Sequence, residues 1–321
     1  MIISEIFTAH SLAVGFFYNA GAHDRVFTLV SLVLIMLNYQ EQLATLVKSA
    51  LTEDIGDGDH STLCCIPPGV EGKAVLKIKQ DGIIAGVEVA EKIFRQLQPT
   101  AIFTRFCEDG DGVKSGDRAF EVQAKVHIIL QCERLVLNCM QRMSGIATLT
   151  RQYADKLSGY KTKILDTRKT TPNFRVLEKE AVRIGGGENH RMGLYDMIML
   201  KDNHIDYAGG IEKAIQAAFE YMQTNKRGMQ IEVETRTLDD VKKVLDCGKG
   251  KVHRIMLDNF SPPMIVEALD LVKHQFETEA SGGINFDNVI EYAATGVDYV
   301  SIGALIHQAK SLDLSLKAVI K

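Results

Sequence analysis

Short apolar segments alternate with amphipathic segments over the second half of the chain. Each apolar segment is too short for a helix and predicts a buried strand; the six lie at 163–165, 197–200, 230–233, 254–257, 277–280 and 298–302. The intervening segments predict helices at about 173–184, 209–225, 237–247, 262–274 and 285–295. Strand–helix alternation is typical of a parallel sheet with right-handed crossovers. We therefore expect a full or partial (β/α) barrel over residues 151–305.

The first half of the chain has a different pattern. Residues 72–79 alternate between apolar and polar side chains, which is typical of a half-buried strand. Further strands are expected at 83–85, 100–106 and 119–126, and helices at 87–97 and 127–153. This pattern predicts an α+β module of antiparallel strands over residues 38–150. Residues 306–321 are expected to form a C-terminal helix.

Residues 1–37 differ from the rest of the chain. Their apolar segment, 26–37, is too short to span a membrane, and it lacks the basic flank and the nearby cleavage site of a signal peptide. Met36 stands just before a segment with helical spacing. Our hypothesis is that translation begins at or near Met36 and that the upstream residues are an extension that packs poorly. Mass spectrometry of the native N-terminus tests this, and a mature chain starting at Met1 would refute it.

Composition narrows the class of protein. Charged residues make up 24% of the 321 residues and the apolar set 46%, as in globular proteins that span no membrane. The net charge of −4 argues against nucleic acid as the main partner. The six cysteines form no CxxC pair, which is typical of reduced thiols and predicts a cytoplasmic protein.

A polar residue or a glycine follows each of the six predicted strands. The active site of a (β/α) barrel lies at the C-terminal ends of its strands, so these residues should share one site. They are Asp166 with Arg168, then Lys201, Glu234, Asp258, Ser281 and Gly303.

The cations of this set come from the first two strands and the segment between them. They are Arg168, Lys169, His190, Arg191 and Lys201. If they converge at one sheet edge, only an anionic ligand would stabilise so many positive charges. The alternative is a solvated basic surface, which is the usual environment of lysine and arginine.

Carboxylates and glycines come from the remaining four strands. Glu234 and Asp258 could accept hydrogen bonds from sugar hydroxyls or hold a divalent metal. The segments 281–283 and 303–305 could bind phosphate through backbone N–H groups, although ordinary turns would look the same. Together these features fit transfer of a phosphorylated sugar to an anionic acceptor. Lys201 as the Schiff-base nucleophile of an aldolase is a second possibility.

The predicted helix at 127–153 is mostly apolar but carries charged residues. Arg134 and Asn138 are one turn apart and share a face. Glu133 could balance Arg142, since charges within an apolar helix often pair locally. From spacing alone, a functional role for Arg134 stays open.

At this point the residues resemble a known family, the quinolinate phosphoribosyltransferases, or carboxylating nicotinate-nucleotide pyrophosphorylases. The match runs in order from about Leu43 to about Leu305. Its segments are ALTEDIGDGDHST, ERLVLN, DTRKTTPNFR, GGGENHRMGLYDMIMLKDNHI, IEVET, RIMLDNF, EASGGI and DYVSIGAL. The resemblance implies an N-terminal α/β sandwich and an incomplete (β/α) barrel. It implies the reaction of quinolinate with phosphoribosyl pyrophosphate to nicotinate mononucleotide, pyrophosphate and CO₂, with Mg²⁺, in NAD biosynthesis.

The resemblance also implies roles for single residues. Lys169, Lys201, Glu234 and Asp258 would be catalytic, the two carboxylates lying at the ribose and the metal. The quinolinate and phosphate pocket would be lined by Thr167, Arg168, Lys169, His190, Arg191, Lys201, Ser281, Gly282, Gly283, Gly303, Ala304 and Leu305. The family forms homodimers, and in some cases hexamers, in which Arg134 would reach the neighbour's site.

Two further alternatives are a phosphoribosyltransferase for nicotinate or another pyridine carboxylate, and an inactive ligand-binding protein. A mono-acid needs fewer cations than quinolinate. All the charged residues expected at the strand ends are present. This argues against an inactive copy, because a protein without activity can lose some of these residues.

Overall fold

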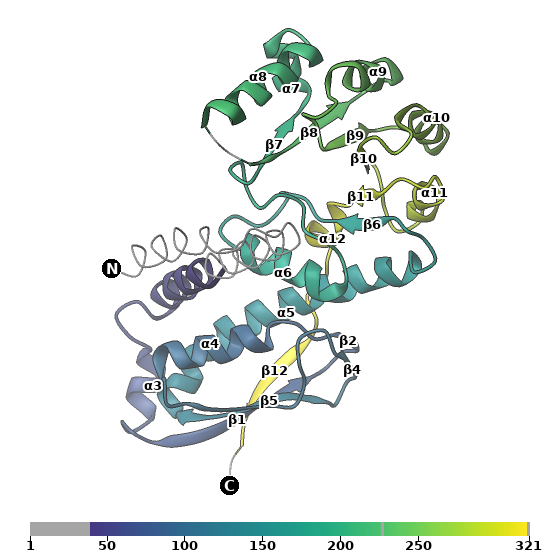
Figure 1. The fold of residues 1–321 in the computed structure, drawn as a ribbon. Helices are drawn as coiled ribbons and strands as arrows, with labels where there is room; N and C mark the ends of the chain where they lie inside the picture. Colours follow the sequence, from purple (N-terminus) through teal and green to yellow (C-terminus); the bar gives the residue numbers. More distant parts are fainter. Residues whose placement is uncertain (1–38, 226–227, 320–321) are drawn as a thin grey trace, which may run out of the picture. The chain divides into compact units, whose positions relative to one another are not determined.

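The computed structural model describes residues 39–225 and 228–319 (Figure 1). Residue contacts divide the chain after Ala50. The described residues of the first part, 39–50, are helical, and the elements below belong to the second part, which begins at Leu51. The hypothesis about Met36 concerns residues outside the described ones. No helix among the described residues is long and apolar enough to cross a membrane.

An antiparallel sheet forms the centre of the first domain. Its four strands, in the order β12-β1-β5-β3, are Leu314–Ala318, Glu71–Ile78, Arg118–Lys125 and Ile102–Arg105. The other elements are β2 (Gly82–Ile83), β4 (Gly112–Val113), α3 (His60–Cys65), α4 (Val87–Leu97) and α5 (Val126–Lys156). Figure 1 shows α4 and α5 along one face of the sheet. Phe94 of α4 meets Phe120 of β5 edge to face, with ring centroids 6.2 Å apart, and both are fully buried.

The expectation of a C-terminal helix at 306–321 is wrong. The short helix α12 (Ala304–His307) ends at His307, and the chain then returns to the first domain as β12. This strand pairs antiparallel with β1, with Leu316 opposite Leu76. Leu314 and Leu316 are buried while Ser315 between them is partly exposed, which is the alternation of a strand with one face against a core. The other predicted domain boundaries stay predictions.

The second domain is built on a parallel six-stranded sheet, as predicted. Its order is β6-β11-β10-β9-β8-β7, with bounds Lys163–Leu165, Tyr299–Ser301, Glu277–Ser281, Arg254–Asp258, Gln230–Thr235 and Met197–Leu200. All five strand pairs are parallel. Because β6 and β7 lie at opposite edges, the sheet is open, which confirms the expected incomplete barrel. All six strand ends point in one direction, so their polar residues lie along one edge.

The helices of this domain follow the predicted order. They are α6 (Arg175–Gly185), α7 (Asp202–Ala208), α8 (Ile211–Asn225), α9 (Leu238–Cys247), α10 (Pro262–Val272) and α11 (Val289–Ala293). Figure 1 shows α8 to α11 side by side along the sheet. The sequence pattern missed α7, which ends at Gly209 with φ of 83°. Helix α6 packs on α5, and Arg142 of α5 pairs there with Glu178 rather than with Glu133.

Candidate active site

A pocket of about 920 Å³ opens at the C-terminal ends of the six parallel strands. All but two of the residues predicted for the site line it: Thr167, Arg168, Lys169, His190, Arg191, Lys201, Glu234, Asp258, Ser281, Gly282, Gly283, Gly303 and Ala304. The exceptions are Leu305, which is fully buried, and Arg134, which is exposed on α5. The shared cavity replaces the alternative of a scattered, solvated basic surface.

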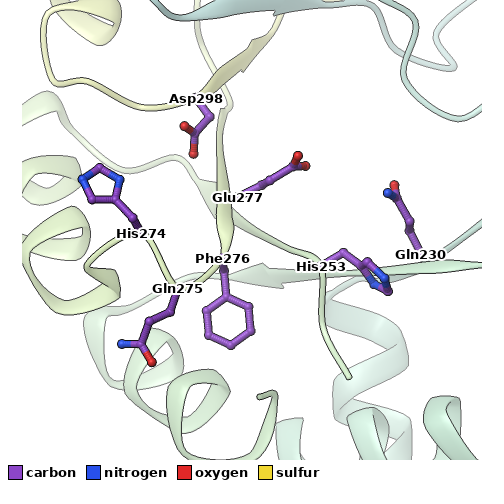
Figure 2. Close-up of a pocket in the computed structure, with 7 residues that line it drawn as sticks. All are labelled: Gln230, His253, His274, Gln275, Phe276, Glu277 and Asp298. Atoms are coloured by element: carbon purple, nitrogen blue, oxygen red, sulfur yellow. The ribbon is translucent and has the colours of Figure 1, made fainter. Parts of the chain in front are cut away.

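A second pocket, of about 380 Å³, lies at the opposite ends of the strands (Figure 2). Its two carboxylates already have partners within the sheet. Glu277 pairs with Arg254, and Asp298 accepts hydrogen bonds from the backbone and hydroxyl of Thr278. This pocket therefore offers few free groups for a ligand, and it lies away from the edge where barrel active sites form.

Arg168 and Arg191 bring two guanidinium groups to the larger pocket. The Nε of Arg168 is buried without a hydrogen-bond partner among the described residues. Burial and the charge of Arg168 lower the pKa of Arg191, whose Nη1 donates only a long bond, 3.3 Å, to the carbonyl of Met197. Two like charges with so few partners leave hydrogen-bonding capacity for an anion.

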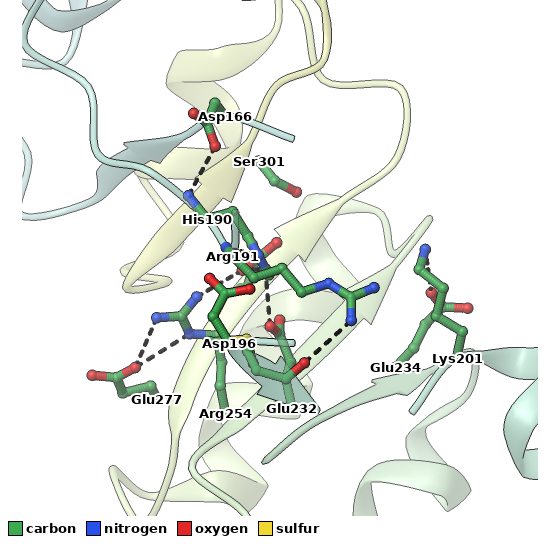
Figure 3. Close-up of polar contacts among 12 residues, drawn as sticks. Asp166, His190, Arg191, Asp196, Lys201, Glu232, Glu234, Arg254, Glu277 and Ser301 are labelled. Atoms are coloured by element: carbon green, nitrogen blue, oxygen red, sulfur yellow. Dashed lines mark hydrogen bonds and ion pairs between the residues drawn. The ribbon is translucent and has the colours of Figure 1, made fainter. Parts of the chain in front are cut away.

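Carboxylates face this cationic side from the neighbouring strands β8 and β9. Glu234 at the end of β8 lies 3.4 Å from the Nζ of Lys201 and accepts a hydrogen bond from the backbone of Asp202 at 3.3 Å. Asp258 ends β9 and accepts a bond of 2.7 Å from the side chain of Asn259. Figure 3 shows the Lys201–Glu234 pair apart from the buried cluster around His190.

A layer of buried charges forms the floor of the pocket, where His190 and Glu279 are among the lining residues; Figure 3 shows its contacts. The Nε2 of His190 is 2.9 Å from Glu232 and 3.4 Å from Glu279. Arg254 completes the layer, 3.0 Å from Glu279. Both glutamates are fully buried. The sequence interpretation took His190 as a pocket cation but missed both carboxylates. Glu232 carried a signal, because it is a charge inside an apolar strand, two residues from Glu234 and therefore on the same face.

Electrostatics in this layer keeps His190 positively charged. Burial alone lowers the pKa of His190, but the carboxylates of Glu232 and Glu279 outweigh it and raise that pKa to about 9. Burial and the charge of Glu279 raise the pKa of Glu232 to about 7. At neutral pH His190 therefore holds a proton on Nε2, which faces the two carboxylates, while Nδ1 accepts a bond of 2.7 Å from the backbone N–H of Arg191.

A second buried ion pair fixes the backbone of His190. Lys179 of α6 contacts Asp166 at the end of β6, and both are fully buried. Asp166 also accepts a bond of 2.8 Å from the backbone N–H of His190, and Lys179 donates one of 3.0 Å to its carbonyl. Burial raises the pKa of Asp166 to about 6, against the charges of Lys179 and His190. The sequence interpretation missed Lys179, which is a buried lysine in an otherwise ordinary amphipathic helix.

Two sets of residues offer metal ligands. Among the described residues, the ligand atoms of His190, Glu232 and Glu279 lie within 4.8 Å of one another. Arg254 and the proton on His190 already supply the positive charge there, so a proton fits this cluster better than a metal ion. Glu234 and Asp258 present carboxylate oxygens to the pocket itself, and oxygen ligands of this kind suit Mg²⁺.

Comparison with protein families decides the class. Residues 146–317 match the C-terminal domain of quinolinate phosphoribosyl transferase, and residues 59–144 match its N-terminal domain. This chain belongs to the quinolinate phosphoribosyltransferase family. The resemblance inferred from the sequence motifs is thereby confirmed.

Members of the family are similar over most of this chain. Quinolinate phosphoribosyltransferase [decarboxylating] 1 of Nicotiana glauca is 47% identical over 86% of this chain and 82% of its own. The chloroplastic nicotinate-nucleotide pyrophosphorylase [carboxylating] of Arabidopsis thaliana is 45% identical over the same share of this chain and 82% of its own. The crystal structure of NadC from Streptococcus pyogenes superposes with a TM-score of 0.79 at 38% identity, covering 87% of this chain and 98% of that one. Since one relative is chloroplastic, a cytoplasmic location stays a prediction.

Proposed function

We propose that the larger pocket is where this chain carries out the reaction of its family. Quinolinate reacts there with phosphoribosyl pyrophosphate to give nicotinate mononucleotide, pyrophosphate and CO₂, a step of NAD biosynthesis. The observation that carries the proposal is the Nε of Arg168, which is buried without a hydrogen-bond partner among the described residues and lies near the charge of Arg191. On the other side of the same pocket lie the carboxylates of Glu234 and Asp258. The cationic side suits a dianionic acceptor, and the side with the carboxylates suits a sugar donor.

Quinolinate binds on the cationic side of the pocket. Its two carboxylates suit the guanidinium groups of Arg168 and Arg191, because arginine can bind a carboxylate with two parallel hydrogen bonds. His190 adds a third positive charge from the floor, and Thr167 adds a hydroxyl at the rim. A mono-acid such as nicotinate would leave part of this charge without a partner, so the geometry favours the diacid.

The phosphates of the donor bind along the segments 281–283 and 303–305. Gly282 has φ of 93°, and a Cβ there would lie 2.2 Å from the side-chain oxygen of Asn259. A Cβ on Gly303 would lie 3.3 Å from the Cδ of Lys169. Both glycines therefore allow close approach that other residues would block. Leu305 can contribute only its backbone, since its side chain is buried.

Glu234 and Asp258 would hold Mg²⁺ together with the donor. They fit this role because both present oxygens at adjacent strand ends, and Glu234 lies 3.4 Å from the Nζ of Lys201. The ion would balance charge on the departing pyrophosphate. The two carboxylates also lie where they can accept hydrogen bonds from the ribose hydroxyls.

The residues of the chain act mainly by positioning and by electrostatics. As pyrophosphate leaves, Lys169 and Lys201 stabilise its growing negative charge, while Glu234 and Asp258 stabilise the positive charge that develops on the ribose. The pyridine nitrogen attacks the anomeric carbon. In the resulting pyridinium, the positive nitrogen stabilises the carbanion formed when the adjacent carboxylate leaves as CO₂, and that ring carbon then takes a proton from solvent water. This step needs little acid–base help, so we assign no obligatory general base.

The Schiff-base alternative has little support in the geometry. A lysine nucleophile of that kind is activated by an apolar environment that excludes water. The side chain of Lys201 is 47% exposed and lies 3.4 Å from Glu234. These features suit a charged ligand for phosphate better than an amine nucleophile.

The proposed assembly is a homodimer, with a hexamer as an extension of it, in which Arg134 reaches the pocket of the neighbouring subunit. Two observations support this. Arg134 is exposed on α5, and it does not line the pocket of its own chain. In the neighbour's pocket it would add a further cation for a quinolinate carboxylate.

Incubation of the purified chain with quinolinate, phosphoribosyl pyrophosphate and Mg²⁺ tests the proposed function. We expect nicotinate mononucleotide to form with quinolinate and not with nicotinate. Product from nicotinate alone would favour the mono-acid alternative. Borohydride trapping of substrate on Lys201 would favour the aldolase. Tight quinolinate binding without any product would indicate an inactive copy.

A further inference from the structure

Glu178 on α6 is a buried carboxylate that receives hydrogen bonds from two distant segments. Arg142 on α5 donates to its Oε1 from Nε at 2.9 Å and from Nη2 at 2.8 Å. Thr171 donates its backbone N–H to Oε2 at 2.8 Å and its hydroxyl to Oε1 at 2.9 Å. The carboxylate has no exposed surface. Because a buried charge is costly unless it is paired and hydrogen-bonded, this arrangement strongly favours one position of the segment around Thr171.

Arg142 reaches a third segment with its remaining donors. Its Nη2 donates to the carbonyl of Ile306 at 2.8 Å and its Nη1 to that of Ala309 at 3.1 Å. Ile306 belongs to α12, and the last carbonyls of a helix have no partner within it. The positive guanidinium therefore binds the carbonyl of Ile306 within α12 and that of Ala309 just beyond it, and fixes the end of α12. Two bonds join Arg142 to Glu178, and four more tie this pair to the other two segments.

The two segments held in this way form one wall of the pocket. Thr171 closely follows Arg168 and Lys169, while α12 begins directly after Gly303. The strands that lead into them, β6 and β11, are neighbours in the sheet. The side chain of Lys169 lies over Gly303, as the 3.3 Å distance to a Cβ built there indicates. The spacing of the two segments thus sets how Lys169 faces the backbone N–H groups at 303–305.

We propose that Arg142 and Glu178 are positioning residues for the phosphate-bearing donor. They hold the segment 167–171 against the segment 303–309, so that Lys169 and the glycine turn contact the same phosphate. Neither residue lines the pocket, so both act through the groups that they hold. This inference rests on the proposed function of the pocket.

Steady-state kinetics of four variants test the proposal. Arg142→Met removes the four hydrogen bonds of Arg142 and leaves Glu178 only those from Thr171. Arg142→Lys keeps the charge, and Thr171→Val removes only the hydroxyl bond to Glu178. Arg105→Met is the matched control, because Arg105 pairs with Glu91 and Glu108 on the first domain. For each variant, kcat, the KM of each substrate and the thermal midpoint are measured.

We expect Arg142→Met to raise the KM for phosphoribosyl pyrophosphate about tenfold, because small displacements of binding groups have large effects. Arg142→Lys should recover part of this loss, and Thr171→Val should raise the same KM about threefold, as loss of one hydrogen bond does. The KM for quinolinate should rise less, and Arg105→Met should change neither value. A purely structural role would lower the thermal midpoint and the apparent kcat while KM stays unchanged.

If Arg142→Met does not fold, Arg142→Lys and Thr171→Val decide the question. The proposal is overturned if every variant that folds binds phosphoribosyl pyrophosphate with the KM of the unaltered chain. That result would leave the proposed function standing, since the unaltered chain would still be active. Failure of the proposed function has a different signature, namely no nicotinate mononucleotide from the unaltered chain.

Discussion

The Nε2 of His190 lies 2.9 Å from a carboxylate oxygen of Glu232, at the floor of the pocket. Glu279 approaches the same nitrogen from the other side at 3.4 Å. The two carboxylates raise the pKa of the imidazole to about 9, although it is almost fully buried. An anionic substrate above it therefore meets a positive charge that does not depend on the substrate for its stability.

The free energy of unfolding should depend on pH through His190. Its pKa rises from 6.5 to about 9 in the folded chain, so its stabilising contribution is full below pH 6.5 and is lost as pH rises through 9. Over this window the loss should be about 1 kcal/mol per pH unit. Urea unfolding between about pH 7.5 and 9 measures this loss of stability. The range lies above the pKa of Glu232, which is about 7.

His190→Gln should flatten this pH dependence, whereas His60→Gln should not. His60 is exposed and pairs with the exposed Asp57, which makes it a matched histidine control. Equal slopes for the unaltered chain and His190→Gln would mean that the buried carboxylates do not hold the proton on His190.

Lys179→Met should destabilise the fold strongly. It leaves the carboxylate of Asp166 buried without its cation, and breaking a buried pair in this way typically costs 3–5 kcal/mol. Asp166→Asn in the same chain should recover part of the loss, because the amide oxygen can still accept the bond from the backbone of His190. Denaturant unfolding measures both effects. A loss below about 1 kcal/mol for Lys179→Met would contradict the account of this pair.

Arg134→Ala and Arg168→Ala should each raise the KM for quinolinate and lower turnover. Because Arg134 is proposed to act on the neighbouring subunit, the two inactive variants should complement each other when mixed and allowed to exchange subunits. In a random mixture of symmetric dimers, about a quarter of the sites regain both arginines.

Activity measured before and after subunit exchange reports this complementation. Each of the two variants put through the exchange alone provides the baseline, and Arg105→Met mixed with Arg168→Ala controls for exchange itself. Mixtures of Arg134→Ala and Arg168→Ala that stay as inactive as the single variants would show that Arg134 does not act across an interface.

Glu234→Gln should weaken the dependence of the reaction on Mg²⁺. The amide keeps the size and one oxygen but loses the charge, so the Mg²⁺ concentration for half-maximal rate should rise about tenfold. Asp239→Asn is the control, since Asp239 is exposed and pairs with Lys242. Initial rates against free Mg²⁺ measure the shift. An unchanged Mg²⁺ requirement in Glu234→Gln would remove this residue from the metal site.

The strands and their polar ends could be predicted from the sequence because both are local signals. Each apolar segment has the length of a strand. Because the strands are parallel, the residue that follows each of them lies at the same edge of the sheet. Arg168, Lys201, Glu234, Asp258, Ser281 and Gly303 were found in this way, whereas Thr167 and Ala304 were named only through the family resemblance. Helix α7 was missed because it is short and runs into Gly209 and Gly210, so its pattern merges with that of α8.

Buried charges were missed because their partners are distant in the sequence. Glu279 meets His190, and Glu178 meets Arg142, only after the sheet and the helices have packed. The strand β12 carried a period-two signal in Leu312, Leu314 and Leu316, but its partner β1 lies near the other end of the chain. The local sequence pattern therefore predicted the helices and strands. Contacts between residues distant in the sequence determine which strands pair and which buried side chains are charged.

The most direct measurement follows CO₂ from quinolinate labelled at the carboxylate next to the ring nitrogen. The account predicts labelled CO₂ in equal amount to nicotinate mononucleotide, only when phosphoribosyl pyrophosphate and Mg²⁺ are both present. Release should fall sharply in Arg168→Ala, because the substrate loses its principal cation. Labelled CO₂ without phosphoribosyl pyrophosphate, or none under any condition, would contradict the claim that the strand ends form a site for transfer and decarboxylation.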